Sequence, residues 1–195
     1  MSETVVSRKV PVGHVVEALC ALPEDAFSDV ERVRELLLAN PVDPESLAQF
    51  LWWDRQHYTR NLIEKTPLFE LLAVCWEVGQ ASSIHNHRDQ NCWMAVPVGR
   101  LMVQNYRVIS KDMAAHRCQL EPTDLSEMNA QRPCAVDPRE PVHSVLNPKD
   151  WAERAVSLHV YSRPFDSCEV YSVELGTYGD IQLRYTTVKG TPVAK

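Results

Sequence analysis

Hydrophobic residues in the first third of the chain recur at the spacing of helix turns. Residues 11–22 carry an apolar stripe at positions that lie on one face of a helix, and the stripe consists of Val15, Val16, Leu19 and Leu22. This pattern predicts an amphipathic helix near the start of the chain.

Two further helices are predicted from polar residues at their starts. Residues 28–31 resemble a capping box, and the helix that they open is expected to run through Leu38. A third helix is predicted after Asp43. Asp43 can cap it, Pro44 suits its first turn, and residues 47–51 supply an apolar face.

From about Tyr58 onward the apolar residues occur in short, partly alternating runs that are typical of strands. The runs cover residues 68–78, 92–96, 101–108, 133–136, 143–146, 155–161, 170–174 and 181–187. Residues 97–99 and 176–179 resemble turns. Many short strands at regular spacing favour an antiparallel sandwich or barrel. We therefore expect one domain over residues 1–195, mainly helical over 1–57 and a β-barrel over 58–190.

Composition and charge narrow the class of protein. The 195 residues carry a formal net charge of -6, which argues against nucleic acid as a partner because phosphate binding needs a basic face. No apolar stretch is long enough to span a bilayer, and the first residues lack the apolar segment of a secretory signal. We expect a cytoplasmic protein that does not bind membranes. None of its six cysteines forms a CxxC pair, so neither a structural zinc site nor a disulfide framework is indicated.

The segment His85-Asn86-His87 is the first candidate for a metal-binding site. Two histidines separated by one residue point to the same side of a strand, so their imidazoles can converge on one ion. A third histidine, His143, lies in a later strand-like run. The spacing resembles the two cupin motifs, and the residues that fit them are Gly79, His85, His87, Gly99, His143 and Asn147. Cys92 stands where those motifs usually carry a carboxylate ligand.

The missing carboxylate affects the chemistry that such a site would perform. Three neutral histidines leave a divalent ion with its full charge and open positions, which favours an anionic bidentate ligand such as a thiolate with a neighbouring amine. Three histidines are equally a zinc pattern, so the ligand count alone does not choose the metal. The three residues are also compatible with ordinary sheet histidines that bind no metal.

Three further segments resemble the cysteine dioxygenase family of cupins. They are residues 58–62, residues 82–87 continuing to Cys92, and residues 157–168, and they occur in the family's order. The resemblance spans about residues 36–185 and implies a cupin-type antiparallel β-barrel, or jelly roll, with N-terminal helices. It also implies an oxidoreductase of cysteine catabolism that holds Fe(2+) through His85, His87 and His143.

The resemblance assigns roles to residues around the iron. Arg60 matches the family residue that binds the substrate carboxylate, and Tyr58 matches a residue of the same pocket. Ser157, His159 and Tyr161 occupy alternate positions of one expected strand and match the family's catalytic relay; His159 and Tyr161 are expected to face the substrate as well.

Two cysteines also match family positions. Cys92 and Tyr161 match the pair that forms a thioether bond in many eukaryotic members. Cys168 resembles a cysteine near the pocket mouth. An ordinary buried thiol is the alternative for each of them.

The implied reaction adds both atoms of dioxygen to the sulfur of L-cysteine and gives cysteine sulfinic acid. One alternative is 3-mercaptopropionate or another small thiol, because Arg163 resembles relatives that oxidise it, although those relatives carry glutamine where this chain has Arg60. The other is a metal-binding cupin without redox chemistry. Asn86 replaces an aspartate that is common in the family and is expected to face away from the site. The expected partners are a small thiol and dioxygen, and the expected state is a monomer.

Overall fold

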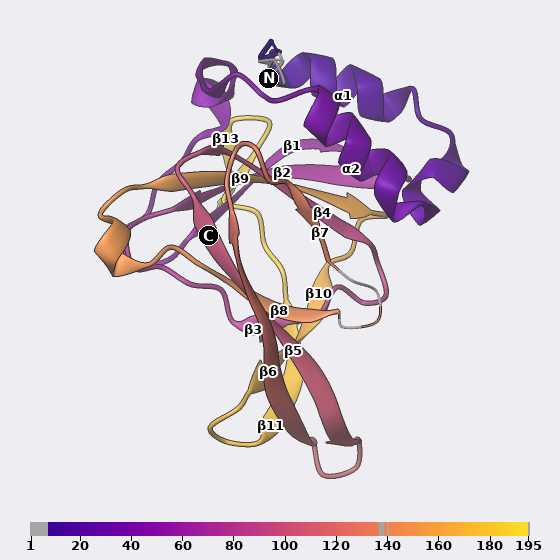
Figure 1. The fold of residues 1–195 in the computed structure, drawn as a ribbon, viewed down its shortest axis with the longest axis vertical. Helices are drawn as coiled ribbons and strands as arrows, with labels where there is room; N and C mark the ends of the chain where they lie inside the picture. The colour runs from indigo at the N-terminus through magenta and orange to yellow at the C-terminus, as the bar shows by residue number, and fades with distance from the viewer. Residues whose placement is uncertain (1–7, 137–138, 140, 195) are drawn as a thin grey trace, which may run out of the picture.

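Helical segments come first in the chain and lie together on one side of a large β structure (Figure 1). The computed structural model describes residues 8–136, 139 and 141–194. Its α-helices are α1 (Val12–Cys20) and α2 (Val30–Ala39), and its early 3-10 helices are η1 (Glu24–Ser28) and η2 (Pro44–Phe50).

Both expected polar caps bind backbone N–H groups, although each differs from the prediction in one respect. The Asp29 carboxylate accepts a hydrogen bond of 3.0 Å from the backbone N–H of Glu31, so α2 begins after Asp29, whereas Ser28 belongs to the preceding turn. Asp43 accepts a bond of 3.2 Å from the N–H of Glu45. The segment that follows Asp43 winds as a 3-10 helix and not as an α-helix.

A seven-stranded sheet lies beneath the helices (Figure 1). Its order is β13-β12-β1-β2-β9-β4-β7, and only the β1–β12 pair is parallel among the described pairs of this sheet. The strands are β1 (Thr59–Lys65), β2 (Phe69–Trp76), β4 (Cys92–Val98), β7 (Cys134–Ala135), β9 (Ala155–Ser162), β12 (Thr187–Val188) and β13 (Thr191–Pro192).

Six other strands pair in a ring, in the order β10-β11-β6-β5-β8-β3, with β3 closing on β10. The long β5–β6 hairpin projects away from the helices (Figure 1). The strands are β3 (Ile84–His85), β5 (Leu101–Asp112), β6 (Arg117–Met128), β8 (Val142–Leu146), β10 (Ser167–Ser172) and β11 (Thr177–Gln182), and η3 (Lys149–Trp151) follows β8.

Strand β2 separates two hydrophobic cores, and every one of its residues is buried. Phe69 and Leu71 belong to the core beneath the helices. Leu72 and Val74 belong to the core inside the barrel, because successive side chains of a strand point to opposite faces. The inner face of this sheet therefore forms one wall of the barrel interior, where functional side chains can project.

The prediction of a mainly β fold with N-terminal helices is confirmed. Four of the described strands lie outside the predicted runs, namely β1, β3, β6 and β13, and β6 carries polar residues on a largely exposed surface. The predicted run at 181–187 is wrong as one strand, because β11 ends at Gln182 and β12 begins at Thr187. The predicted turn at 176–179 lies a few residues earlier, since Thr177 already opens β11. Across the described chain, no helix is both long and apolar enough to cross a membrane.

Candidate metal centre and its pocket

Strand pairing brings the three predicted histidines together. β3 pairs with β8 so that His85 lies directly opposite His143. His87 follows two residues after His85, just beyond the end of β3. One potential ligand atom from each of the three rings lies within 4.8 Å of the others. This spacing allows the three imidazoles to hold a single metal ion.

The histidines carry the properties that metal ligands need. Burial lowers the pKa of His87 and His143 well below the usual value, and neighbouring histidines lower both further. Burial also lowers the pKa of His85 to about 4, although a hydrogen bond to the Ser83 carbonyl opposes this shift. All three rings are therefore neutral at pH 7, the form that coordinates metals.

Hydrogen bonding leaves ring nitrogens available in this cluster. His85 Nδ1 lies 2.8 Å from the Ser83 carbonyl oxygen, which assigns the ring proton to Nδ1 and leaves Nε2 as a ligand atom. Both ring nitrogens of His87 and of His143 are buried and have no hydrogen-bond partner among the described residues. Buried polar atoms are rarely left unpaired, so these nitrogens fit a metal ion as their missing partner.

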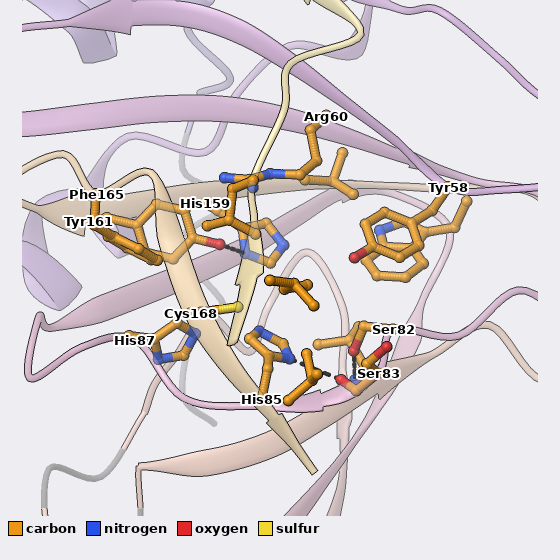
Figure 2. A pocket seen from close by; sticks show the side chains of 16 residues that line it. Tyr58, Arg60, Ser82, Ser83, His85, His87, His159, Tyr161, Phe165 and Cys168 are labelled. Atoms are coloured by element: carbon orange, nitrogen blue, oxygen red, sulfur yellow. Dashed lines mark hydrogen bonds between the residues drawn. The ribbon is translucent and has the colours of Figure 1, made fainter. Parts of the chain in front are cut away.

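A small pocket opens beside the histidines, and Figure 2 shows Tyr58, Arg60, His85, His159 and Tyr161 around it. Its volume is about 40 Å³. A buried water occupies roughly 10–15 Å³ on this scale, so the space suits a ligand of only a few heavy atoms. Apolar side chains form most of the remaining wall and include Val74, Val145, Val170 and Leu183.

Arg60 brings the positive charge to this pocket. Its side chain is 12% exposed, and its Nη1 is buried without a hydrogen-bond partner among the described residues. The aromatic ring of Tyr58 stacks on Trp76 at a centroid distance of 4.6 Å, which fixes the ring in the pocket wall. A guanidinium with an unpaired, buried N–H group in a small and mostly apolar pocket is suited to an anionic ligand group.

A hydrogen-bonded chain runs along the inner face of β9. Ser157 Oγ lies 2.9 Å from His159 Nε2, and the Tyr161 hydroxyl lies 3.1 Å from His159 Nδ1. Burial, followed by the positive charge of Arg60, lowers the pKa of His159 to about 3, so the ring is neutral.

Trp76 determines which group donates in each of these hydrogen bonds. Its indole N–H donates to Ser157 Oγ at 2.9 Å. Ser157 is fully buried, and its hydroxyl proton is satisfied if it is donated to His159 Nε2. The His159 proton then lies on Nδ1 and is donated to the Tyr161 oxygen. The Tyr161 hydroxyl then keeps its own proton, which it can donate to the neighbouring Cys92 sulfur or into the pocket.

Cys92 and Tyr161 face each other across neighbouring strands. They are directly paired residues of β4 and β9, so their side chains lie on the same face of the sheet. Burial raises the pKa of the Cys92 thiol and of the Tyr161 hydroxyl well above their usual values. Both groups therefore keep their protons at neutral pH.

Of the remaining predicted residues, Cys168 lines the pocket, whereas Asn86 and Arg163 do not. Cys168 is 2% exposed and lines the pocket (Figure 2). Asn86 faces away from the histidines and bonds to Glu169 at 2.8 Å. Arg163 lies outside the pocket, with a side chain that is 67% exposed and paired with Glu24 at 3.1 Å. The described residues contain no cis peptide bond.

Sequence reasoning missed three residues around Arg60 and the relay, namely Glu70, Trp76 and Tyr185. Glu70 is fully buried beside Arg60 and accepts a hydrogen bond from Tyr185. The available signal was a single charged residue in the otherwise apolar run at 68–76. The contacts of Trp76 and Tyr185 carried no such signal, because aromatic residues are common in any core.

Comparison with known proteins adds an independent finding. Residues 1–174 match the family described as cysteine dioxygenase type I. Cysteine dioxygenase type 1 from Danio rerio is 26% identical over 191 residues, which cover 97% of this chain and 93% of the relative. The Bos taurus protein of the same name is 30% identical over 179 residues, covering 90% of this chain and 86% of the relative.

A Klebsiella pneumoniae protein described as having a double-stranded β-helix domain aligns with a TM-score of 0.46 at 13% sequence identity. The alignment covers 70% of this chain and 88% of that protein.

Proposed function

This chain belongs to the cysteine dioxygenase type I family, and on that premise we propose that it oxidises L-cysteine to cysteine sulfinic acid in the cytoplasm. One observation supports this most strongly. Three neutral histidines with free ring nitrogens converge beside a small pocket, and Arg60 lines that pocket with an unpaired N–H group. The arrangement can hold a metal ion and a small anionic ligand side by side.

His85, His87 and His143 would hold the metal, and we propose ferrous iron. When bound, this ion supplies the redox chemistry that lets dioxygen react with a thiol, and its charge favours the thiolate. The described residues bring no carboxylate into the cluster, so coordination positions stay open for the substrate.

Arg60 would bind the substrate carboxylate. A charge-assisted hydrogen bond is among the stronger polar contacts, and the buried Nη1 is the available donor. Tyr58 would line the same end of the substrate. Burial raises the pKa of Tyr58, so its hydroxyl keeps the proton that it can donate.

Tyr161 would steer the reacting atoms. Its hydroxyl accepts from His159, a direction that Ser157 and Trp76 maintain, and would donate its own proton into the pocket. We propose that oxidation joins Cys92 to Tyr161 in a thioether bond. The carbon–sulfur bond would replace one S–H and one ring C–H bond, and the two protons and two electrons would pass to dioxygen.

The overall reaction is balanced without a further reductant. The thiol R–SH and dioxygen combine into the sulfinic acid R–SO₂H, so sulfur loses the four electrons that reduce both oxygen atoms.

The outward position of Arg163 removes one reason to prefer 3-mercaptopropionate, because this side chain does not line the pocket. Two observations therefore support L-cysteine as the substrate: Arg60 lines the pocket, and the chain belongs to the cysteine dioxygenase type I family.

The test is oxygen uptake by the iron-loaded protein with L-cysteine, 3-mercaptopropionate and 2-aminoethanethiol, with detection of the sulfinate. Arg60→Ala should raise the KM for L-cysteine by roughly 10- to 100-fold, as expected when a hydrogen bond to a charged group is lost. Arg163→Ala is the matched control, because it removes an exposed arginine outside the pocket. An unchanged KM in Arg60→Ala would refute the substrate assignment, and absence of sulfinate with all three thiols would refute the proposed function.

A further inference from the structure

Glu70 is a buried charge in an apolar strand. It lies in β2 between Phe69 and Leu71, and its side chain is 0% exposed. Its register partner is Tyr161 of β9, so Glu70 projects from the inner face of the sheet toward the barrel interior. Burying a carboxylate is costly unless charged or hydrogen-bonding groups compensate for it. The groups around Glu70 therefore indicate why it is tolerated.

One oxygen of Glu70 is held firmly by the protein. The Tyr185 hydroxyl donates to Oε2 at 2.6 Å, and burial together with this bond raises the pKa of Tyr185. Lys65 Nζ lies 3.0 Å from the Tyr185 oxygen and 3.9 Å from Oε2. These contacts fix the orientation of the carboxylate.

The second oxygen of Glu70 faces Arg60. Oε1 lies 3.6 Å from Arg60 Nη2 and has no hydrogen-bond partner among the described residues. The guanidinium carbon of Arg60 also lies 5.9 Å from the centre of the Tyr185 ring. Arg60 therefore has Glu70 and Tyr185 beside it, whereas its Nη1 is unpaired and buried.

We propose that Glu70, held by Tyr185, is a positioning residue that orients the Arg60 guanidinium so that Nη1 meets the carboxylate of the thiol. This inference rests on the proposed function. Glu70 engages the Nη2 side of the guanidinium and leaves the other side for the ligand. It sets how strongly the pocket prefers thiols that carry a carboxylate over thiols that lack one.

A different role for Glu70 would change the KM in the opposite direction when the residue is replaced. If its negative charge only offset that of Arg60, its removal would strengthen the attraction between Arg60 and an anionic substrate, and KM would fall. If Glu70 orients the guanidinium, its removal lets the side chain turn away from the ligand, and KM rises.

The kinetic test compares Glu70→Gln with the wild-type protein on L-cysteine and 2-aminoethanethiol, which lacks the carboxylate. The KM for L-cysteine should rise about tenfold, the factor that corresponds to a modest loss of binding free energy, whereas kcat stays within about twofold. The KM for 2-aminoethanethiol should not change. Glu64→Gln is the matched control, because Glu64 is a β1 carboxylate that pairs with Lys189 away from the pocket.

A binding measurement provides a readout without turnover. Anaerobic titration calorimetry of the iron-loaded protein with L-cysteine should give a Kd that rises about tenfold in Glu70→Gln. Tyr185→Phe keeps the ring but loses the bond to Glu70, so it should shift the Kd in the same direction by a smaller factor. If Glu70→Gln does not fold, Tyr185→Phe decides the question by the same criteria.

The inference and the proposed function fail in different ways. A wild-type protein that oxidises none of the thiols refutes the function. A wild-type protein that prefers L-cysteine, with variants whose KM and Kd are unchanged or lower, overturns the role of Glu70. An equal change for both thiols also overturns it, because a general disturbance of the pocket would not distinguish the carboxylate.

Discussion

The residues of the site differ in how far they could be identified from the sequence. His85 and His87 were identified from their spacing, because alternate residues of a strand share a face, whereas His143 was identified from the resemblance to the cupin motifs. Arg60 and the relay on β9 came from the family resemblance. Glu70 could not be assigned from sequence, because its partner Tyr185 lies 115 residues away along the chain.

At the residue scale, Cys92 and Tyr161 give a direct prediction. They are paired across β4 and β9 with side chains on one face, so turnover should join them in a thioether bond. Mass spectrometry of proteolytic fragments should find the two segments linked and lighter by two hydrogen atoms. Cys92→Ser should abolish the link and lower kcat several-fold, because a fixed phenol is better preorganised.

The control for this experiment is Cys118→Ser. Cys118 belongs to a separate hydrophobic cluster near Tyr171, so its substitution should leave the link intact. Unlinked fragments from wild-type protein after many turnovers would contradict the proposed bond.

At the scale of elements, the fully buried strands β2 and β9 were predicted and the exposed strand β6 was not, although β1 was also missed and is partly buried. β2 is buried along its whole length and reads as a nearly continuous apolar run, whereas the equally buried β9 alternates apolar residues with Ser157, His159 and Tyr161. β6 is largely exposed, so its 12 residues lack the clear alternation that marks a half-buried strand. The polar half of the β5–β6 hairpin is held by pairing between the strands, which a single segment does not reveal.

The turn from β4 into β5 gives the prediction at this scale. Gly99 has a φ of +68°, and a Cβ atom there would lie 2.5 Å from the carbonyl oxygen of Arg154. Gly99→Ala should therefore lower the free energy of unfolding by about 1–3 kcal/mol or more, since both the conformation and the contact are unfavourable. Urea unfolding followed by circular dichroism would measure this change.

Gly13 offers a matched substitution in a different setting. It lies in α1, and a Cβ atom there would meet nothing within 4 Å. Gly13→Ala should raise the free energy of unfolding by about 0.5–1 kcal/mol, because alanine favours the helix. Equal effects of the two substitutions would contradict the account of the Gly99 turn.

At the scale of the whole molecule, the proposed metal connects distant parts of the chain. His85 and His87 precede β4, whereas His143 lies in β8, so an ion held by all three stabilises the folded state and not the unfolded one. Ferrous iron at 100 times its Kd should add about 2.7 kcal/mol. For a chain of this size that corresponds to a rise of roughly 5–10 °C in the Tm.

Anaerobic thermal scans with and without ferrous iron would measure this stabilisation. His143→Ala should lose most of the rise, because two histidines hold the ion less tightly than three. His116→Ala should retain it, since His116 is exposed and lies outside the cluster. A full rise of the Tm in His143→Ala would show that this residue is not a ligand.

The double burial of β2 limits where the chain can vary in length. Its alternate residues belong to the helix-covered core and to the pocket wall, so one inserted residue would turn every side chain beyond it to the wrong face. Arg60 is paired with β2 and Tyr161 with both β2 and β4, and these pairings would be disturbed. The exposed end of the β5–β6 hairpin has no such constraint. Insertions and deletions among homologues should therefore concentrate at that tip and be excluded from the strand beneath the helices.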